Sequence, residues 1–188
     1  MNYYRKPLVE NLAYQQKEYS TAQLQKVTET IIQKLNYYQL EITKNDTIKV
    51  ENKHSQKKMY KLAINGYSHL EADFPQLKYQ YKSVKSSLMS LLQSYIGTGG
   101  YLNPLTGEAH VNDRVPKTGY PTTICHEMAH QIGFAAENVA NFVGFLAANY
   151  NDDVFFKYAS YRMAFGYCIS ELRKRDRKLT KKSFPTPT

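Results

Sequence analysis

The spacing of apolar residues along the chain predicts mostly helices, each with one apolar side. Apolar positions recur every three or four residues from Ser20 or Thr21 onward, which is the period of an α-helix. A second helix is expected over residues 55–72, and Pro75 ends it. The predicted inward positions are Leu24, Val27, Ile31, Leu35 and Tyr38 in the first helix, and Met59, Leu62, Ala63 and Leu70 in the second.

The centre of the chain predicts a β-hairpin. Segments 100–103 and 108–112 flank a Pro-Leu-Thr-Gly turn and follow the chain-breaking run 97–100. The predicted fold class is α+β: mostly helical, with a small antiparallel sheet or hairpin packed beside a central helix. The remaining elements are expected to be a strand over 47–51, a strand over 79–84, a helix over 86–95 and a last helix over 154–173.

The central helix carries His126-Glu127-Met128-Ala129-His130, the HExxH pattern of zinc-dependent hydrolases. Residues four apart lie one above the other on a helix face, so the imidazoles of His126 and His130 can bind one metal ion. Glu127 is then placed to reach a water in the open position of the metal. The motif therefore predicts a Zn²⁺ site with Glu127 as the catalytic base. Thr122 and Thr123 are expected to cap this helix.

The residues after the motif predict a turn and a third ligand. The apolar pattern stops at Gly133, which suits a left-handed helix end and lets the chain double back toward the metal. Glu137 then begins a strongly apolar helix that reaches Ala148. A catalytic zinc site has three protein ligands and keeps one position for water. Glu137 is the predicted third ligand, and the alternative is an ordinary acid in the first turn of a helix.

Between residues 99 and 147 the chain resembles domain-of-unknown-function family 3810. The resemblance implies a zincin-like core in a bacterial, membrane-tethered protein, and a metallopeptidase activity. The helix that begins at Glu137 also resembles the Glu-x-x-Ala-Asp/Asn ligand helix of other zincins, including prenyl-protein-processing membrane proteases. The segments that carry the family resemblance are 101–112, 121–131 and 137–142, together with residues 2–8, which are similar to the segment after the family's membrane anchor.

One position departs from the family pattern. Members commonly carry Glu-x-Glu-Ala-Asn, whereas this chain has Val139 in place of the second Glu. If the first acid, Glu137, is the ligand, the site is complete, and Asn141 one turn later can support its carboxylate through a hydrogen bond. If the second acid is the ligand, this chain has lost its third ligand and is inactive.

The length of 188 residues predicts a single domain, and the resemblance implies that it is zincin-like. It is expected to span residues 1–178, with N-terminal helices over 1–96, the active-site core over 97–178 and a disordered tail over 179–188. No apolar run is long enough to cross a bilayer, and no signal peptide is evident, so the chain itself is expected to be soluble. The resemblance implies an extracytoplasmic fragment of a cell-envelope protein that is anchored in the membrane upstream.

The net charge of +9 does not indicate nucleic-acid binding. Much of the excess lies in residues 173–178 and 181–182, where no nucleic-acid motif and no interleaved aromatic residues occur. A solvated helix end, or attraction to anionic headgroups, explains this charge better. Cys125 and Cys168 are expected to be buried thiols that do not bind the metal, with pairing across their helices as the alternative.

Three functions remain open. The first is a zinc metallopeptidase acting on a peptide or protein, in which the strand over 108–112 forms the cleft edge and pairs with an extended substrate. The second is a catalytically inactive zincin-fold domain that binds a peptide or partner, and the third is a basic surface-binding domain with an incidental metal. A peptidase also needs an oxyanion donor besides the metal. The candidates are Tyr161, Tyr158, His110 and Tyr101.

Overall fold

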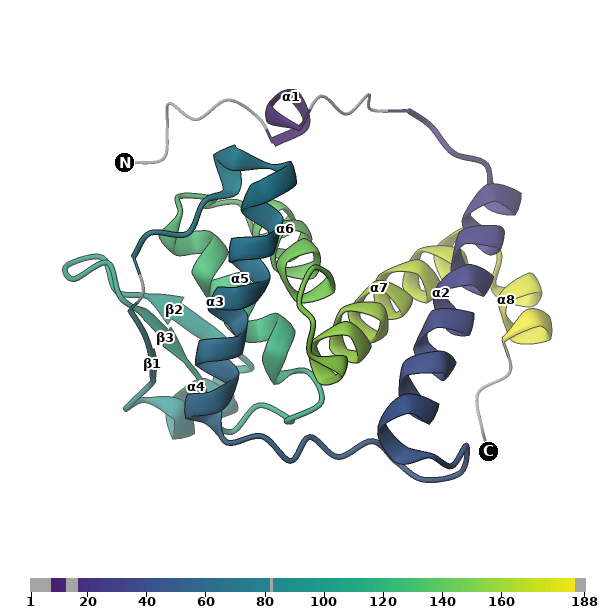
Figure 1. Ribbon diagram of the computed structural model, residues 1–188. Helices are drawn as coiled ribbons and strands as arrows, with labels where there is room; N and C mark the ends of the chain where they lie inside the picture. The colour runs from purple at the N-terminus through teal and green to yellow at the C-terminus, as the bar shows by residue number, and fades with distance from the viewer. Residues whose placement is uncertain (1–7, 13–16, 82, 185–188) are drawn as a thin grey trace.

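Helices dominate the computed structural model, which describes residues 8–12, 17–81 and 83–184 (Figure 1). The helices are α1 (Leu8–Asn11), α2 (Thr21–Thr43), α3 (Gln56–Asp73), α4 (Ser90–Ile96), α5 (Tyr120–Gln131), α6 (Glu137–Asn149), α7 (Val154–Arg175) and α8 (Arg177–Ser183), with a 3₁₀ turn at Pro75–Leu77. The strands are β1 (Val84–Ser86), β2 (Gly100–Leu102) and β3 (Ala109–Val111). The predicted class, α+β and mostly helical, is confirmed.

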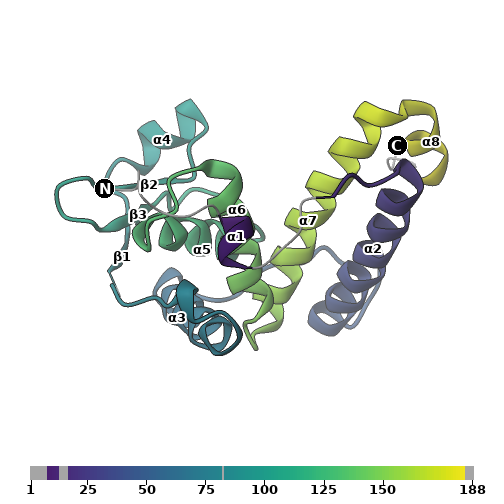
Figure 2. The same cartoon turned by 90° about the horizontal axis from the view of Figure 1, so that it is seen from above.

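The elements form two regions that α7 joins (Figures 1 and 2). We call α3, α4, α5, α6 and the sheet the site lobe, because the HExxH motif lies on α5. We call α2, α8 and the C-terminal half of α7 the arm. Within the site lobe α5 packs on α6, whereas the main packing partner of α2 is α7.

The sheet is mixed and has the strand order β1-β3-β2. β2 and β3 form the predicted antiparallel hairpin, with Tyr101 opposite His110. β1 runs parallel to β3, with Lys85 opposite His110, so the prediction of a purely antiparallel sheet is wrong. The central strand is β3 and an edge strand is β2, so the edge predicted at residues 108–112 belongs to β2 instead. Pairing of β1 with a strand that follows α4 and β2 is a long-range contact, which local patterns do not encode.

Close contacts between helices position the motif. The core is built from fully buried side chains of α3, α5 and α6, among them Tyr67, Leu70, Ile124, Met128 and Val143. A Cβ atom at Gly144 of α6 would lie 2.8 Å from the backbone nitrogen of His126, and one at Gly66 of α3 would overlap the carbonyl of Ala147. Only glycine allows these helices to approach so closely.

Gln131, the last residue of α5, ties the motif helix to the sheet. Its side-chain amide donates to the carbonyl of Gly107 at 2.8 Å and to that of Ser83 at 3.1 Å. Its side-chain oxygen accepts from the hydroxyl of Tyr79 at 2.5 Å. Because Gln131 is buried, these bonds are shielded from water and hold the hairpin against α5.

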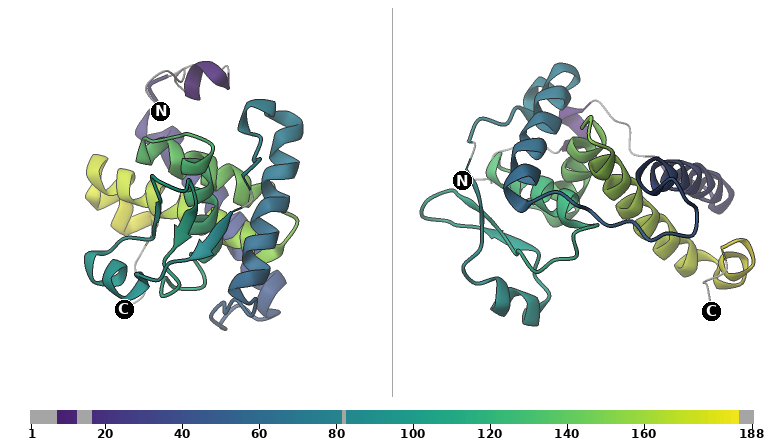
Figure 3. Two further views of the ribbon diagram at one scale, coloured as in Figure 1. Left: turned by 90° about the vertical axis from the view of Figure 1, so that its left-hand side faces the viewer. Right: turned by 60° about the horizontal axis from the view of Figure 1, so that its bottom comes forward.

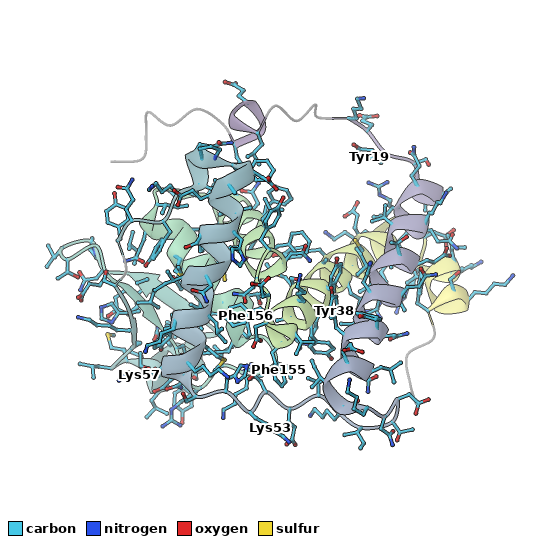
Figure 4. The ribbon with its side chains drawn as sticks, in the orientation of Figure 1. Tyr19, Tyr38, Lys53, Lys57, Phe155 and Phe156 are labelled. Atoms are coloured by element: carbon cyan, nitrogen blue, oxygen red, sulfur yellow. The ribbon has the colours of Figure 1, made fainter. Side chains whose placement is uncertain are left out.

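In the arm, α2 packs along α7. Tyr38 of α2 stacks on Tyr161 of α7 with ring centroids 5.6 Å apart, and Figure 4 shows Tyr38 on the side of α2 that faces α7. Near the other end of α2, Arg175 donates to the carbonyl of Tyr19 at 2.7 Å. The two helices therefore run antiparallel.

The predicted inward side of α2 is partly wrong. Val27 is 51% exposed, and its neighbour Thr28 is buried instead. The hydroxyl of Thr28 donates to the carbonyl of Leu24 at 2.7 Å, so a polar side chain can be buried at the helix contact without an unpaired group. The hydrophobic pattern alone could not anticipate this exchange.

Helix starts were predicted better than strands. Helices were predicted to start near Ser20 and Ser55, and these residues cap α2 and α3. The strand predicted over 79–84 overlaps β1 only at Val84, and the short helix predicted over 86–95 begins only at Ser90. The strand predicted over 47–51 does not form; residues 44–50 are bends and extended chain.

The segment predicted to be a disordered tail begins as a helix. Asp176 caps α8 by accepting from the amide of Leu179 at 2.8 Å, which supports helix where the Lys-rich composition suggested none. Residues 185–188 lie outside the described part of the chain, as do residues 2–7 of the segment that resembles a post-anchor sequence. None of the described helices is long and apolar enough to cross a membrane.

Candidate metal centre

The residue at which α5 begins determines the directions in which the motif side chains point. α5 begins at Tyr120 with Pro121 in its first turn, so the prediction that Thr122 and Thr123 cap it is wrong. Proline suits this position because its missing N–H would be unpaired there. Both threonine hydroxyls instead donate to the carbonyl of Gly119, at 2.8 and 3.2 Å.

The end of α5 orients the second histidine. Gly133 has a φ of 101°, the predicted left-handed conformation. The amide of Phe134 donates to the carbonyl of Ala129 and that of Gly133 to the carbonyl of His130, at 3.1 and 2.9 Å, which is the Schellman pattern. Nδ1 of His130 hydrogen-bonds to the carbonyl of Phe134 at 2.7 Å. Because a carbonyl can only accept, Nδ1 carries the proton and Nε2 keeps its lone pair in the neutral ring.

Three predicted ligands converge between α5 and α6. The Nε2 atoms of His126 and His130 lie 3.0 Å apart. The carboxylate of Glu137 approaches them at 3.3 and 3.5 Å. One ligand atom from each residue lies within 4.8 Å of the others, so the group could hold a metal ion.

The structure of α6 shows which of the two positions, 137 or 139, faces the histidines. Glu137 faces the two imidazoles, whereas Val139 is packed against the hydrophobic core. Residues two apart do not share a helix face, so both positions cannot point at the same group. The acid that joins the histidines in this chain is Glu137.

His126 lies in surroundings that favour its neutral form. Burial lowers the pKa of His126, and the neighbouring His130 lowers it further, whereas Glu137 and the side chain of Asn141 raise it. The neutral imidazole is the form that binds metals. The sequence predicted a contact of Asn141 with Glu137, and the structure places Asn141 beside His126.

Glu127 is buried next to the metal-binding group. Its side chain is packed under β2, where a Cβ atom at Gly100 would lie 2.5 Å from its carboxylate oxygen Oε1. Its Oε2 atom has no hydrogen-bond partner within the described part of the chain. Burial, and then the charge of Glu137, raise the pKa of Glu127 to about 8. A carboxylate with this proton affinity can take up a proton near neutral pH.

A cavity of about 860 Å³ opens over these residues. One wall consists of β2 and the preceding segment 97–99, and another consists of residues from the start of α5. His126, Glu127, His130 and Glu137 all line it. Substrate-sized space, a candidate base and the metal-binding group therefore share one cavity.

Of the four candidate oxyanion donors, one lines the cavity. Tyr101 lines it, whereas Tyr158, Tyr161 and His110 are not among its lining residues. Tyr101 is also held in place, because its ring stacks on that of His110 with centroids 4.9 Å apart. Tyr161 is engaged with Tyr38 of the arm.

Arg162 is a cavity residue that the sequence analysis missed. Its guanidinium nitrogen Nη1 lies 3.4 Å from the position that a Cβ atom on Gly119 would take, beside the start of α5. It makes no ion pair with a residue that the structure describes. No local pattern distinguishes it from the other cations of the last helix, because only the crossing of α7 over α5 brings it to the cavity.

The chain belongs to the family described as "Protein of unknown function (DUF3810)", whose model matches residues 1–185. This confirms the resemblance found from the motif region. No curated protein and no solved structure matches the chain. The function must therefore be argued from the metal centre itself.

Proposed function

We propose that the protein is a zinc-dependent metallopeptidase with a zincin-like core. The observation that carries the proposal is the convergence of His126, His130 and Glu137 within 4.8 Å, in the cavity that also contains the buried carboxylate of Glu127. Two histidines and one acid are a common ligand set of catalytic zinc, and three protein ligands leave one position open.

The residues fit zinc in three respects. The donors are nitrogen and oxygen atoms, which zinc accepts. Nδ1 of His130 is engaged by the carbonyl of Phe134, an outer contact typical of histidine ligands. The Nε2 atoms of both histidines face the Glu137 carboxylate. Zinc bound there would lower the pKa of a coordinated water and polarise the scissile carbonyl.

Glu127 would act as the proton carrier. Its unpartnered Oε2 atom can take a proton from the attacking water, whose oxygen bonds to the carbonyl carbon. As the C–N bond breaks, Glu127 can pass this proton to the leaving amine. Burial raises the pKa of Glu127 in the metal-free site, and the charge of a bound zinc would lower it again, so that Glu127 would be ionised when it accepts the proton. Tyr101 is the favoured donor to the oxyanion, because it lines the cavity.

The substrate would be an extended peptide or protein segment. β2 is an edge strand and lines the cavity, so its unpaired backbone can add a substrate as one more strand. The extracytoplasmic location and the upstream membrane anchor that the family resemblance implies belong to the same proposal. They would place this cavity where envelope proteins are accessible.

Glu127→Gln tests the proposal. An amide keeps the shape of the side chain but cannot take a proton from water, so turnover of an unfolded protein substrate should fall by about a hundred- to ten-thousand-fold. Zinc content, measured by elemental analysis, should stay at one per chain. Glu171→Gln, on the arm, is the matched control and should keep full activity. Zinc-loaded wild type that cleaves no faster than Glu127→Gln would instead support a catalytically inactive peptide-binding domain.

Glu137→Ala tests the ligand assignment separately. Removing the carboxylate should lower zinc affinity by at least about tenfold, because the two imidazoles then lack their third partner. Competition with a chromophoric chelator measures this affinity. Unchanged affinity would show that Glu137 is not a ligand, whatever the activity of the wild type.

A further inference from the structure

Helix α4 has the reverse of the usual surface-helix pattern. Its buried residues are polar, namely Ser90 and Gln93, and they follow buried Ser87. A surface helix normally buries its apolar side and exposes its polar side. Here the exposed residues of α4, apart from Ser94, are apolar. Together with two exposed residues just before the helix they form what we call the α4 apolar surface: Leu88, Met89, Leu91, Leu92, Tyr95 and Ile96.

Specific hydrogen bonds hold α4 in this orientation. The hydroxyl of Ser90 accepts from the amide of Asp113 at 3.1 Å and donates to the carbonyl of Ser87 at 2.7 Å. The amide side chain of Asn112 donates to the hydroxyl of Ser94 at 3.1 Å. Rotating the helix to bury its leucines would break these bonds. The outward direction of the apolar side chains is therefore built into the fold.

The α4 apolar surface projects from the molecule. α4 lies at the periphery of the site lobe, on the side away from the arm, in Figure 2 and in the right panel of Figure 3. The side chain of Leu88 is 101% exposed and that of Tyr95 is 82% exposed. Side chains that stand out this far do not form a groove for a ligand. Such side chains can instead enter the apolar interior of another phase, such as a lipid layer.

The charges near α4 differ from those of the rest of the chain. No Asp, Glu, Lys or Arg occurs from Ser86 to Gly107, although 22% of all residues are charged. Beside α4, the charged exposed residues of the loop after Asn112 are Asp113, Arg114 and Lys117, so cations outnumber acids there, and the two cations form no ion pair with the described residues. An uncharged apolar projection bordered by cations is complementary to an anionic membrane surface.

We infer that the α4 apolar surface inserts into the interfacial region of an anionic lipid bilayer. Hydrocarbon accepts projecting side chains at any angle, whereas a second copy of the chain would have to offer a shaped apolar surface. The cations beside α4 would meet phosphate headgroups. Because segment 97–102 leads from α4 into the cavity wall, docking would hold the cavity close to the membrane. The inference does not depend on bound metal or on turnover.

The absence of tryptophan from the chain allows a direct test. Tyr95→Trp places one indole in the α4 apolar surface, and Tyr37→Trp places one on the exposed side of α2 as a matched control. Vesicles of phosphatidylcholine and phosphatidylglycerol should shift the emission of Tyr95→Trp to shorter wavelength, and brominated lipids should quench it. The emission of Tyr37→Trp should not change. Vesicles of phosphatidylcholine alone should bind more weakly.

A second experiment removes the apolar side chains. Leu88→Ser combined with Leu91→Ser and Leu92→Ser should reduce vesicle partitioning by at least about tenfold, because each exposed leucine loses its transfer into hydrocarbon. The exposed positions of these residues should leave the thermal unfolding midpoint unchanged. Equal partitioning of this variant and the wild type would overturn the inference. A blue shift that depends on protein concentration without lipid, together with a dimer in sedimentation, would assign the surface to a second copy instead.

Discussion

The site lobe and the arm differ most clearly in how their helices use burial. α5 has 12 residues and buries nine of them, including the catalytic candidate Glu127. α2 has 23 residues, and Thr28 is the only one of them that is buried. A helix enclosed on most sides keeps its side chains in fixed directions. In a helix with one contact face, the side chains outside that face can change direction.

This difference indicates what each region does for the candidate metal centre. The distances between His126, His130 and Glu137 depend on the approach of α6 to α5, which Gly144 permits. Gln131 then anchors α5 to the sheet. The arm contributes no residue to the cavity through α2 or α8. Rigid packing is concentrated where the ligand geometry requires it.

The largest expected contrast comes from truncating one leucine in each region. Leu70→Ala in α3 removes a fully buried side chain and should cost about 2–5 kcal/mol of unfolding free energy, through lost transfer and a cavity. Leu35→Ala in α2 removes a partly exposed side chain and should cost about 1 kcal/mol or less. Urea unfolding measures both. Equal costs would show that the arm is packed as tightly as the site lobe.

Two glycines sharpen the comparison, because substitution by alanine should change the free energy of unfolding in opposite directions at the two positions. Gly144→Ala would bring a Cβ atom to 2.8 Å from the backbone of His126 and should cost about 1–3 kcal/mol. Gly166→Ala in α7 meets nothing within 4 Å and should stabilise by about 0.5–1 kcal/mol, through better helix propensity. Thermal unfolding gives the signs. Gly144→Ala should also weaken zinc binding, and Gly166→Ala should not.

The third expected contrast is a pH dependence of the metal-free protein. The folded pKa of Glu127, about 8, lies above its unfolded value, so the folded state holds a proton that the unfolded state releases. Stability should therefore fall as pH rises through this window. Between pH 6.5 and 8 the loss relative to Glu127→Gln should be up to about 2 kcal/mol. Staying above pH 6.5 avoids protonation of His126, whose pKa is lowered.

Glu171 of the arm is the control for this titration. The side chain of Arg175 lowers the pKa of Glu171, so Glu171 is ionised in both the folded and unfolded states above pH 6.5. Glu171→Gln should therefore leave the slope of stability against pH unchanged. Unfolding midpoints across the pH series, recorded with a chelator present, compare the two variants. A slope that is the same in wild type and Glu127→Gln would show that Glu127 is not protonated in the folded protein.

Features that depend on near neighbours in the chain were predicted well. The helix starts near Ser20 and Ser55, the left-handed turn at Gly133 and the placement of Glu137 at the start of a new helix were all readable from the sequence. Helices form by contacts between residues three and four apart, so their signals are local. The two histidines share a helix face for the same reason.

Features that depend on residues far apart in the chain were not predicted well. Each strand has three residues, and β1 pairs with β3 across the intervening α4 and β2. The apolar residues of α4 predict a helix with a buried apolar side, yet bonds to Ser90 and Ser94 turn that side outward. Arg162 reaches the cavity only because α7 crosses α5.

The sequence by itself determined the ligand types, their helical spacing and the turn that lets the chain return to them. Local hydrogen bonding and side-chain periodicity suffice for these. Only the tertiary structure decided that β2 forms the cavity edge, that Val139 faces the core and that Glu127 is buried with a raised pKa. Burial and electrostatic surroundings are properties of packed elements, and packing brings together residues that the chain keeps far apart.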